Sequence, residues 1–344
     1  MNEKAIQKEN RIEWIDFARG AGILLVLLGH TTFLPLIPKG YIYSFHMPLF
    51  FVLSGYVFVC KSTFKEFTVK RLKSLVLPYF SFLLVYFVAF TFKCLILHEP
   101  EKFDRSITGL AIQKTGYTYA IWFFIVLFVT EIIFYVIAKY VTKQYLLFGI
   151  IVLMVAIDVA YFKLIDKSLP FQLQICFTAL PFYAFGYLLK NIKLIDKMNK
   201  LAYVYMFLLA IISVSLFVVK CKFYNPYTSL TSNHYGNFVI FYSLAVSTVL
   251  LILLASSKIR ELKVINYIGK NSIVIFSLHQ PLVTLPLNLL VVKVVGKDYM
   301  NRFSFIENIL LSIAELIITM AILLIVNSVI NHTFLRVFIG KTKK

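Results

Sequence analysis

Ten long apolar stretches constrain this sequence more than any other feature. Each is about 20 residues long, the length that a helix needs to cross the hydrocarbon core of a bilayer. A membrane is crossed only by helices or closed barrels, and stretches of this length predict an all-α, polytopic bundle of about ten transmembrane helices. The stretches are centred on residues 17–37, 43–60, 76–97, 121–138, 145–162, 170–189, 201–219, 237–255, 272–295 and 308–330.

Composition excludes an ordinary soluble protein. Hydrophobic residues make up 60% of the 344 residues, charged residues only 15%, and the mean hydropathy is +0.83. No polar stretch is long enough for a separate soluble domain, so we expect one transmembrane domain over residues 1–344. The four cysteines are scattered without the paired spacing of a zinc site, and we expect no metal.

The distribution of positive charge predicts the orientation. Assigned to alternate sides of ten crossings, and leaving out Arg19, 22 Lys and Arg residues lie on the side of the termini and 12 on the opposite side. The positive-inside rule therefore predicts that both termini are cytoplasmic, in a multi-pass protein of the cell (cytoplasmic or inner) membrane. The net charge of +19 reflects this topology and attraction to anionic lipid, and it gives no reason to expect nucleic acid.

Arg19 and His30 are the unusual residues of the first apolar stretch. They are 11 residues apart, about three helical turns, so both project from one face, roughly 16 Å apart along the axis. An ionisable side chain at bilayer depth is costly and is a functional hypothesis by default. The alternatives are that His30 makes a polar contact with a neighbouring helix and that Arg19 extends to the interface, where Asp16 could pair with it.

Two adjacent segments carry a family resemblance. RIEWIDFARGAGILLVLLGH followed by YIYSFHMPLFFVLSGYVF resembles the membrane acyltransferase-3 family, in which an Arg and a His separated by ten residues precede an aromatic-rich segment ending in Ser-Gly. Asp16, Arg19, Gly20, Gly29 and His30 occur in the family's order, and weaker similarities follow at 71–80, 122–131, 180–189 and 268–282. The sequence is similar to members that acetylate surface polysaccharides. The resemblance implies transfer of an acyl group, usually acetyl from acetyl-CoA, to a carbohydrate hydroxyl.

Acyl transfer to an alcohol needs a base for the hydroxyl proton and stabilisation of the oxyanion on the thioester carbonyl. A histidine suits the first task, so we assign His30 as the general base. Arg19, with Asp16, would organise the site or bind a donor phosphate. A CoA headgroup would remain in the cytoplasm while its thin pantetheine arm reaches inward towards His30.

The cations Lys70, Arg71 and Lys73 precede the third apolar stretch on the expected cytoplasmic side. They would hold the phosphates of CoA through lysine point charges and bidentate contacts of Arg71. Ordinary topology and lipid binding explain the same charges equally well. Lys73 stands where members of the family carry a second arginine.

Four further residues are candidates for a supporting role or for substrate contacts. His46 and Ser54 could border one cavity; alternatively, Ser54 and the following glycine simply permit a close helix contact. Glu131 could position a histidine or contact the acceptor sugar, and His279 could face the cavity. For the remaining acidic residues within apolar stretches, Asp158 and Glu315, we expect polar contacts between helices. The non-cytoplasmic loops 98–119 and 220–237 carry aromatic, amide and hydroxyl groups suited to sugars.

These observations predict a membrane O-acyltransferase that moves acetyl from cytoplasmic acetyl-CoA to a hydroxyl of an extracytoplasmic or lipid-linked glycan. Two alternatives stay open. One is a transporter or flippase for a glycan or small molecule, with Arg19 and His30 in the translocation path. The other is a non-catalytic partner subunit. The expected partners are the glycan acceptor and the lipid bilayer, with a homo-oligomer or a partner in a polysaccharide pathway as further options.

Overall fold

The computed structural model describes residues 13–96, 120–259 and 262–340. This part of the chain is almost entirely helical, apart from one antiparallel bridge between Ser229 and His234. The first half contains α2 (Glu13–Gly29), α3 (Leu36–Tyr56), α4 (Phe64–Arg71), α5 (Leu77–Ile96), α7 (Trp122–Tyr140), α8 (Gln144–Leu164) and α9 (Ile175–Asn191). The second half contains α10 (Leu194–Met198), α11 (Ala202–Phe223), α12 (Phe238–Ile259), α13 (Lys263–Lys270), α14 (Ser272–His279), α15 (Leu285–Val294) and α16 (Phe305–His332).

Eight helical segments of the described residues are long and apolar enough to cross a membrane. They are Phe64–Ala89, Trp122–Tyr140, Gln144–Leu164, Pro170–Asn191, Leu194–Phe223, Phe238–Ile259, Ser272–Val294 and Phe305–His332. Each matches one of the predicted stretches. The other two predicted stretches correspond to α2, which has 17 residues, and to α3, which carries Lys39, Ser44 and His46. The chain is therefore a polytopic helical membrane protein.

The boundaries predicted for α2 and α3 were wrong. The first apolar stretch, 17–37, does not form one helix, because α2 ends at Gly29 and α3 begins at Leu36. Phe33 and Leu34 are buried within the intervening turn, so the apolar pattern continues where the helix does not. Pro35 directly precedes α3, where its missing N–H and fixed φ are tolerated. His30 consequently lies at the end of a helix instead of in the middle of one.

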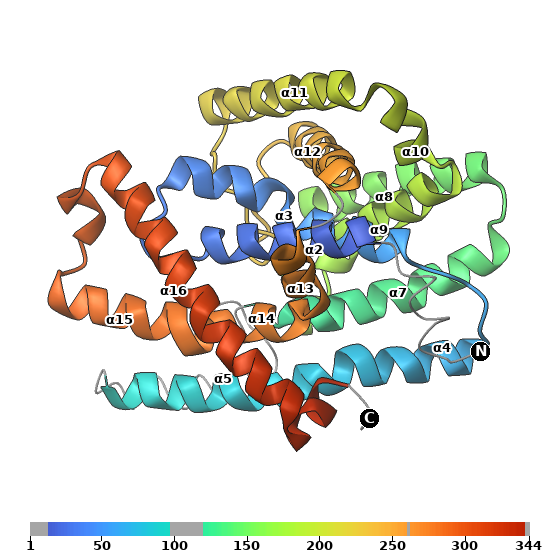
Figure 1. The fold of residues 1–344 in the computed structure, drawn as a ribbon. Helices are drawn as coiled ribbons and strands as arrows, with labels where there is room; N and C mark the ends of the chain where they lie inside the picture. Colours follow the sequence, from blue (N-terminus) through green and yellow to red (C-terminus); the bar gives the residue numbers. More distant parts are fainter. Residues whose placement is uncertain (1–12, 97–119, 260–261, 341–344) are drawn as a thin grey trace.

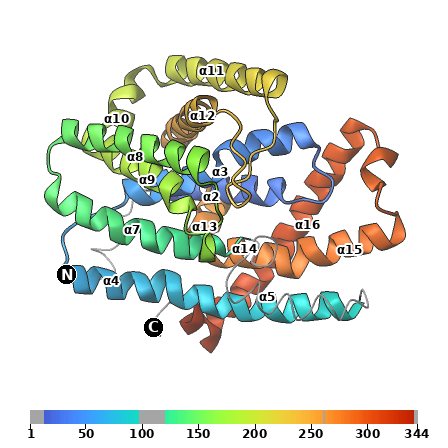
Figure 2. The ribbon, with the colours of Figure 1, turned by 180° about the vertical axis from the view of Figure 1, so that it is seen from behind.

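Helices α2 and α3 occupy the interior of the bundle. Figures 1 and 2 show α11 and α12 on one side of them and α7 with the α4–α5 helix on the other, while α16 crosses obliquely. The outer helices α8, α11 and α16 expose many large apolar side chains, such as Phe148, Phe207 and Ile317, as expected for surfaces that face lipid. The polar candidate residues of α2 and α3 are therefore placed inside the protein.

Glycines bring two pairs of helices into close contact. A Cβ atom on Gly55 of α3 would lie 1.9 Å from the carbonyl oxygen of Tyr183 on α9, and one on Gly186 would lie 2.0 Å from that of Val52. Small residues let helix backbones approach in this way. For Gly55, the structure confirms the close helix contact that the sequence offered as an alternative. Helices α2 and α13 make a similar contact through Gly20 and Gly269.

Two π-helical turns interrupt otherwise continuous helices. The segment η1 (Leu72–Val76) joins α4 to α5, and η4 (Gln280–Thr284) joins α14 to α15. A proline follows each turn by two residues, Pro78 after η1 and Pro286 after η4, and its ring would clash in a regular α-helix with the carbonyl four residues earlier, which lies within the turn. A π turn relieves such a clash and often occurs at functional sites. Arg71 directly precedes the first turn, and Gln280 begins the second.

The two described ends of the chain lie at the same end of the bundle. Trp14 near the start of α2 contacts Tyr56 at the end of α3, with ring centroids 5.2 Å apart. Gly340 packs against the backbone of Lys73 at the α4–α5 junction. This is the end that holds the lysines and arginine at 61–73. Their cytoplasmic location stays a prediction.

Candidate active site

A cavity of about 290 Å³ lies where the C-terminal end of α2 meets α3, α7 and the α14–α15 helix. Its described lining contains aromatic, hydroxyl and amide side chains and no Asp, Glu, Lys or Arg. The polar and aromatic lining residues are His30, Tyr43, His46, Trp122, Gln172, Tyr227, Thr228, Ser229, Thr231, Ser232, Phe276 and Gln280. The cavity thus joins His30 and His46 with the loop between α11 and α12.

The turn after α2 holds His30 in place. The backbone N–H of His30 still donates to the carbonyls of Val26 and Leu27, both at 3.1 Å, so the residue continues the helix. Two residues later, the N–H of Thr32 donates to Glu315 Oε2 at 2.7 Å and its hydroxyl to Oε1 at 3.1 Å. Both residues are buried. Glu315 therefore makes a buried polar contact from α16 to the turn that carries His30, where we expected a contact between two helices.

Three side chains surround the imidazole of His30. The Tyr43 hydroxyl and the Gln280 amide nitrogen each lie 3.1 Å from Nδ1. The ring of His279 lies 5.1 Å from that of His30, centroid to centroid. Because Nδ1 is engaged by two partners, Nε2 is the nitrogen available to a substrate in the cavity.

His46 and His279 have well-defined tautomers. Nδ1 of His46 lies 2.9 Å from the carbonyl of Ile42, and Nδ1 of His279 lies 2.6 Å from that of Phe276. A carbonyl only accepts, so Nδ1 carries the proton in each ring, and in the neutral form Nε2 has a free lone pair. His46 lines the cavity. His279 is fully buried, and its Nε2 has no hydrogen-bond partner among the described residues.

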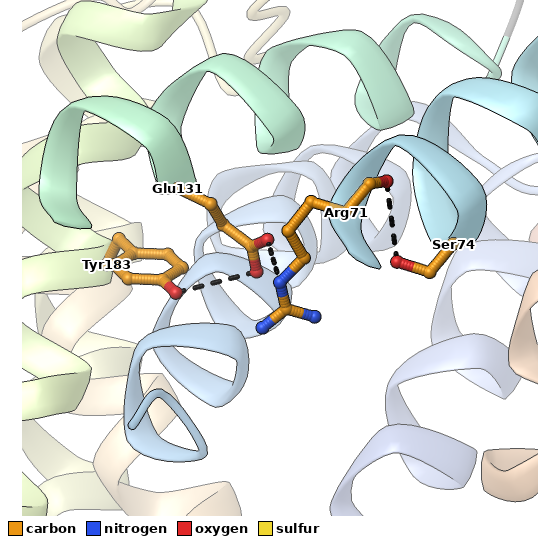
Figure 3. A network of polar contacts seen from close by, with 4 residues as sticks. All are labelled: Arg71, Ser74, Glu131 and Tyr183. Atoms are coloured by element: carbon orange, nitrogen blue, oxygen red, sulfur yellow. Dashed lines mark hydrogen bonds and ion pairs between the residues drawn. The ribbon is translucent and has the colours of Figure 1, made fainter. Parts of the chain in front are cut away.

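A second polar cluster lies between α4, α7 and α9 (Figure 3). Arg71 Nε is 2.7 Å from Glu131 Oε2, and the Tyr183 hydroxyl donates to Glu131 Oε1 at 3.5 Å. The two terminal nitrogens of Arg71 lie on the far side of the guanidinium from this carboxylate (Figure 3). Arg19 is close enough to act electrostatically on Glu131. Arg71 therefore pairs with Glu131 here, and Arg19 acts on the same carboxylate.

The two sites lie near opposite ends of α2. Arg19 belongs to the cationic cluster and His30 to the cavity, so their spacing of 11 residues separates the sites by roughly 16 Å along the helix. Lys70 and Lys73, the other cations expected to bind CoA, are exposed beside Arg71. Asp16 is buried next to the contact of α2 with α13.

Other sequence candidates lie elsewhere. Ser54 is not among the residues described as lining the cavity, because eight residues of helix place it about 12 Å along α3 from His46. Asp158 accepts hydrogen bonds from Thr178 at 2.8 Å and Tyr242 at 2.7 Å, which is the interhelical contact that we expected. Residues 98–119 lie outside the described part of the chain. The second candidate loop does supply cavity residues, at 227–232.

Sequence reasoning missed Tyr43, Trp122, Tyr227 and Gln280. Tyr43 and Gln280 both occur inside segments that resemble the family, at three residues before His46 and one residue before Pro281. Their types alone do not distinguish them from the many interfacial tyrosines and buried amides of a membrane protein. Among the described residues, no group of three His, Cys, Asp or Glu side chains is arranged to hold a metal ion.

Comparison with known proteins identifies the family. The model of the acyltransferase-3 family, described as an acyltransferase domain, matches residues 12–332, which is nearly the whole chain. No curated protein and no solved structure matches the sequence. The matched range includes both polar sites and every described helix from α2 to α16. The chain belongs to the acyltransferase-3 family and is a multi-pass membrane acyltransferase.

Proposed function

We propose that the protein transfers acetyl from cytoplasmic acetyl-CoA to a hydroxyl of an extracytoplasmic or lipid-linked glycan, in the cell (inner) membrane. The observation that carries this proposal is the position of His30. It lines a cavity and lies roughly 16 Å along α2 from Arg19, near the ion pair of Arg71 with Glu131. The family supplies acyl transfer; the two sites suggest how donor and acceptor would meet.

The cavity suits a sugar. A sugar carries many hydroxyl groups that need hydrogen-bond partners, and its C–H faces pack against aromatic rings. Trp122 and Tyr227 offer such rings, and Thr228, Ser229 and Gln172 offer donors and acceptors. The residues at 227–232 belong to a loop that the charge distribution places on the non-cytoplasmic side. Their position therefore favours an acceptor that enters from that side.

The cationic cluster suits the phosphates of CoA. Glu131 holds the Nε side of Arg71, which orients the guanidinium and leaves its terminal nitrogens for an anion. Arg19 adds a second positive charge, and Lys70 and Lys73 add exposed ones. A pantetheine arm extended along α2 would carry the thioester from this cluster towards His30.

His30 would act as the general base. Its Nε2 takes the proton of the acceptor hydroxyl while the hydroxyl oxygen attacks the thioester carbonyl carbon. The C–S bond then breaks, the CoA thiolate leaves, and the proton on His30 returns to the thiolate sulfur. The products are the acetyl ester and free CoA. His46 lines the same cavity, and its unprotonated Nε2 would accept a hydrogen bond from a further hydroxyl of the acceptor.

The experiment is release of free CoA by the purified protein in liposomes, with acetyl-CoA and glycan acceptor. We expect His30→Ala to lower the rate by about 100-fold or more, the usual contribution of a general base. His332→Ala is the matched control, because His332 is an exposed histidine at the end of α16. Full CoA release by His30→Ala would refute the base assignment. Absence of acetyl-CoA binding, with glycan export intact in His30→Ala, would favour a transporter.

A further inference from the structure

We propose that Gln280 is the positioning residue of the active site: its amide carbonyl holds the proton of His30 on Nδ1 and so keeps Nε2 free to act as the base. This inference rests on the proposed role of His30. It concerns a residue that the sequence pattern did not single out, and it follows from the hydrogen bonds around one imidazole.

The π turn at η4 aims Gln280 at His30. The helix widens over Gln280–Thr284, where the backbone N–H of Leu285 donates to the carbonyl of Gln280. The carbonyl of His279 accepts from the hydroxyl of Thr284, five residues later, at 3.2 Å. The widened turn leaves Pro281 and Leu282 on an apolar groove beside α5, while Gln280 lines the cavity that contains His30.

The proposed base role of His30 identifies which amide atom must face its Nδ1. Gln280 Nε2 lies 3.1 Å from His30 Nδ1, and Gln280 Oε1 is buried without a partner among the described residues. A rotation of the amide by 180° exchanges its nearly isosteric oxygen and nitrogen. Oε1 then accepts the proton of Nδ1, and the amide nitrogen takes the place that Oε1 held.

The rotated amide suits the whole reaction. With Nδ1–H donated to Oε1, neutral His30 presents the lone pair of Nε2 to the acceptor hydroxyl. After proton transfer, the imidazolium still donates Nδ1–H to the same oxygen, so nothing has to move during the chemical step. Tyr43, the other partner of Nδ1, has a hydroxyl that both donates and accepts, and it does not select one tautomer.

The test compares Gln280→Met with Gln280→Glu in the CoA-release assay. Methionine keeps the length of the side chain but lacks the acceptor, and we expect kcat to fall about 10- to 100-fold with KM for both substrates unchanged. An ionised glutamate only accepts, here from Nδ1–H, and we expect Gln280→Glu to keep kcat within about 10-fold of the native value. Leu282→Val, on the same π turn but on the lipid-facing groove, is the control for the fold of this turn.

Three results would overturn the inference. They are native kcat in Gln280→Met, equal losses in Gln280→Met and Gln280→Glu, or a rise in KM as the main effect. Tyr43→Phe is the second variant: we expect a smaller loss than in Gln280→Met, and a larger loss would assign the role to Tyr43. An active His30→Ala variant would refute the base role itself, an outcome distinct from a failure of Gln280.

Discussion

Substitution of Gly55 by alanine tests the contact that holds α3 against α9. The added Cβ would lie 1.9 Å from the Tyr183 carbonyl oxygen, whereas ordinary van der Waals contact begins at 3.4 Å. The two backbones would have to separate by about 1.5 Å. Overpacking costs about 1–3 kcal/mol and sometimes more. The atoms that the new Cβ would meet are backbone atoms of Tyr183, which cannot move aside as a flexible side chain can. We therefore expect the free energy of unfolding to fall by about 3 kcal/mol or more, roughly 100-fold in the folding equilibrium constant.

The assay is SDS titration of detergent-purified protein, followed by tryptophan fluorescence. The chain has two tryptophans: Trp122 is buried, and Trp14 is partly buried against the core. Gly149→Ala is the matched control, since a Cβ on this glycine of α8 meets nothing within 4 Å. There we expect a gain of about 0.5–1 kcal/mol from helix propensity. Equal midpoints for the two variants would refute the close crossing of α3 and α9.

Two further predictions address the support of each site. Glu315→Leu should destabilise the protein by about 1–3 kcal/mol and lower kcat, because the buried N–H of Thr32 loses its acceptor. Glu315→Gln keeps an acceptor and should destabilise the protein less. Equal losses for the two variants, in stability by SDS titration and in kcat by CoA release, would contradict this role of Glu315. Arg71→Leu should raise KM for acetyl-CoA about 10-fold and destabilise by about 3 kcal/mol, since buried Glu131 loses its cation. The double variant Arg71→Leu/Glu131→Leu should recover the lost stability but keep the raised KM for acetyl-CoA. A native KM in both the single and the double variant would contradict a role of Arg71 in binding acetyl-CoA.

Apolar length predicted the helical bundle well, because a bilayer allows few alternatives. The prediction of helix ends failed where buried residues are not helical. Phe33 and Leu34 are buried in a turn, and an apolar sequence does not distinguish a buried turn from a helix. The close contacts at Gly55 and Gly20 could be suspected from sequence. Their partners on α9 and α13 are more than 100 residues away, beyond the reach of a local pattern.

The site was predictable only in part. Arg19 and His30 stand out because each is costly in an apolar stretch, and their spacing gives their separation along α2. The partners of His30 depend on helices that meet in space: Gln280 is 250 residues away, and a π turn sets its direction. Glu315 reaches Thr32 across 283 residues. Such pairings have no signature in the local sequence, since a polar residue in an apolar helix has many possible partners.

The most direct test of the account is a mass comparison of surface glycans from cells that carry the native protein, the His30→Ala variant, the His332→Ala control or no protein. The account predicts glycans heavier by one acetyl group in cells with native protein or His332→Ala, and no such increment in cells with His30→Ala or without the protein. Identical glycans with and without the native protein would contradict the proposed acceptor. The same increment in His30→Ala cells would contradict the proposed base.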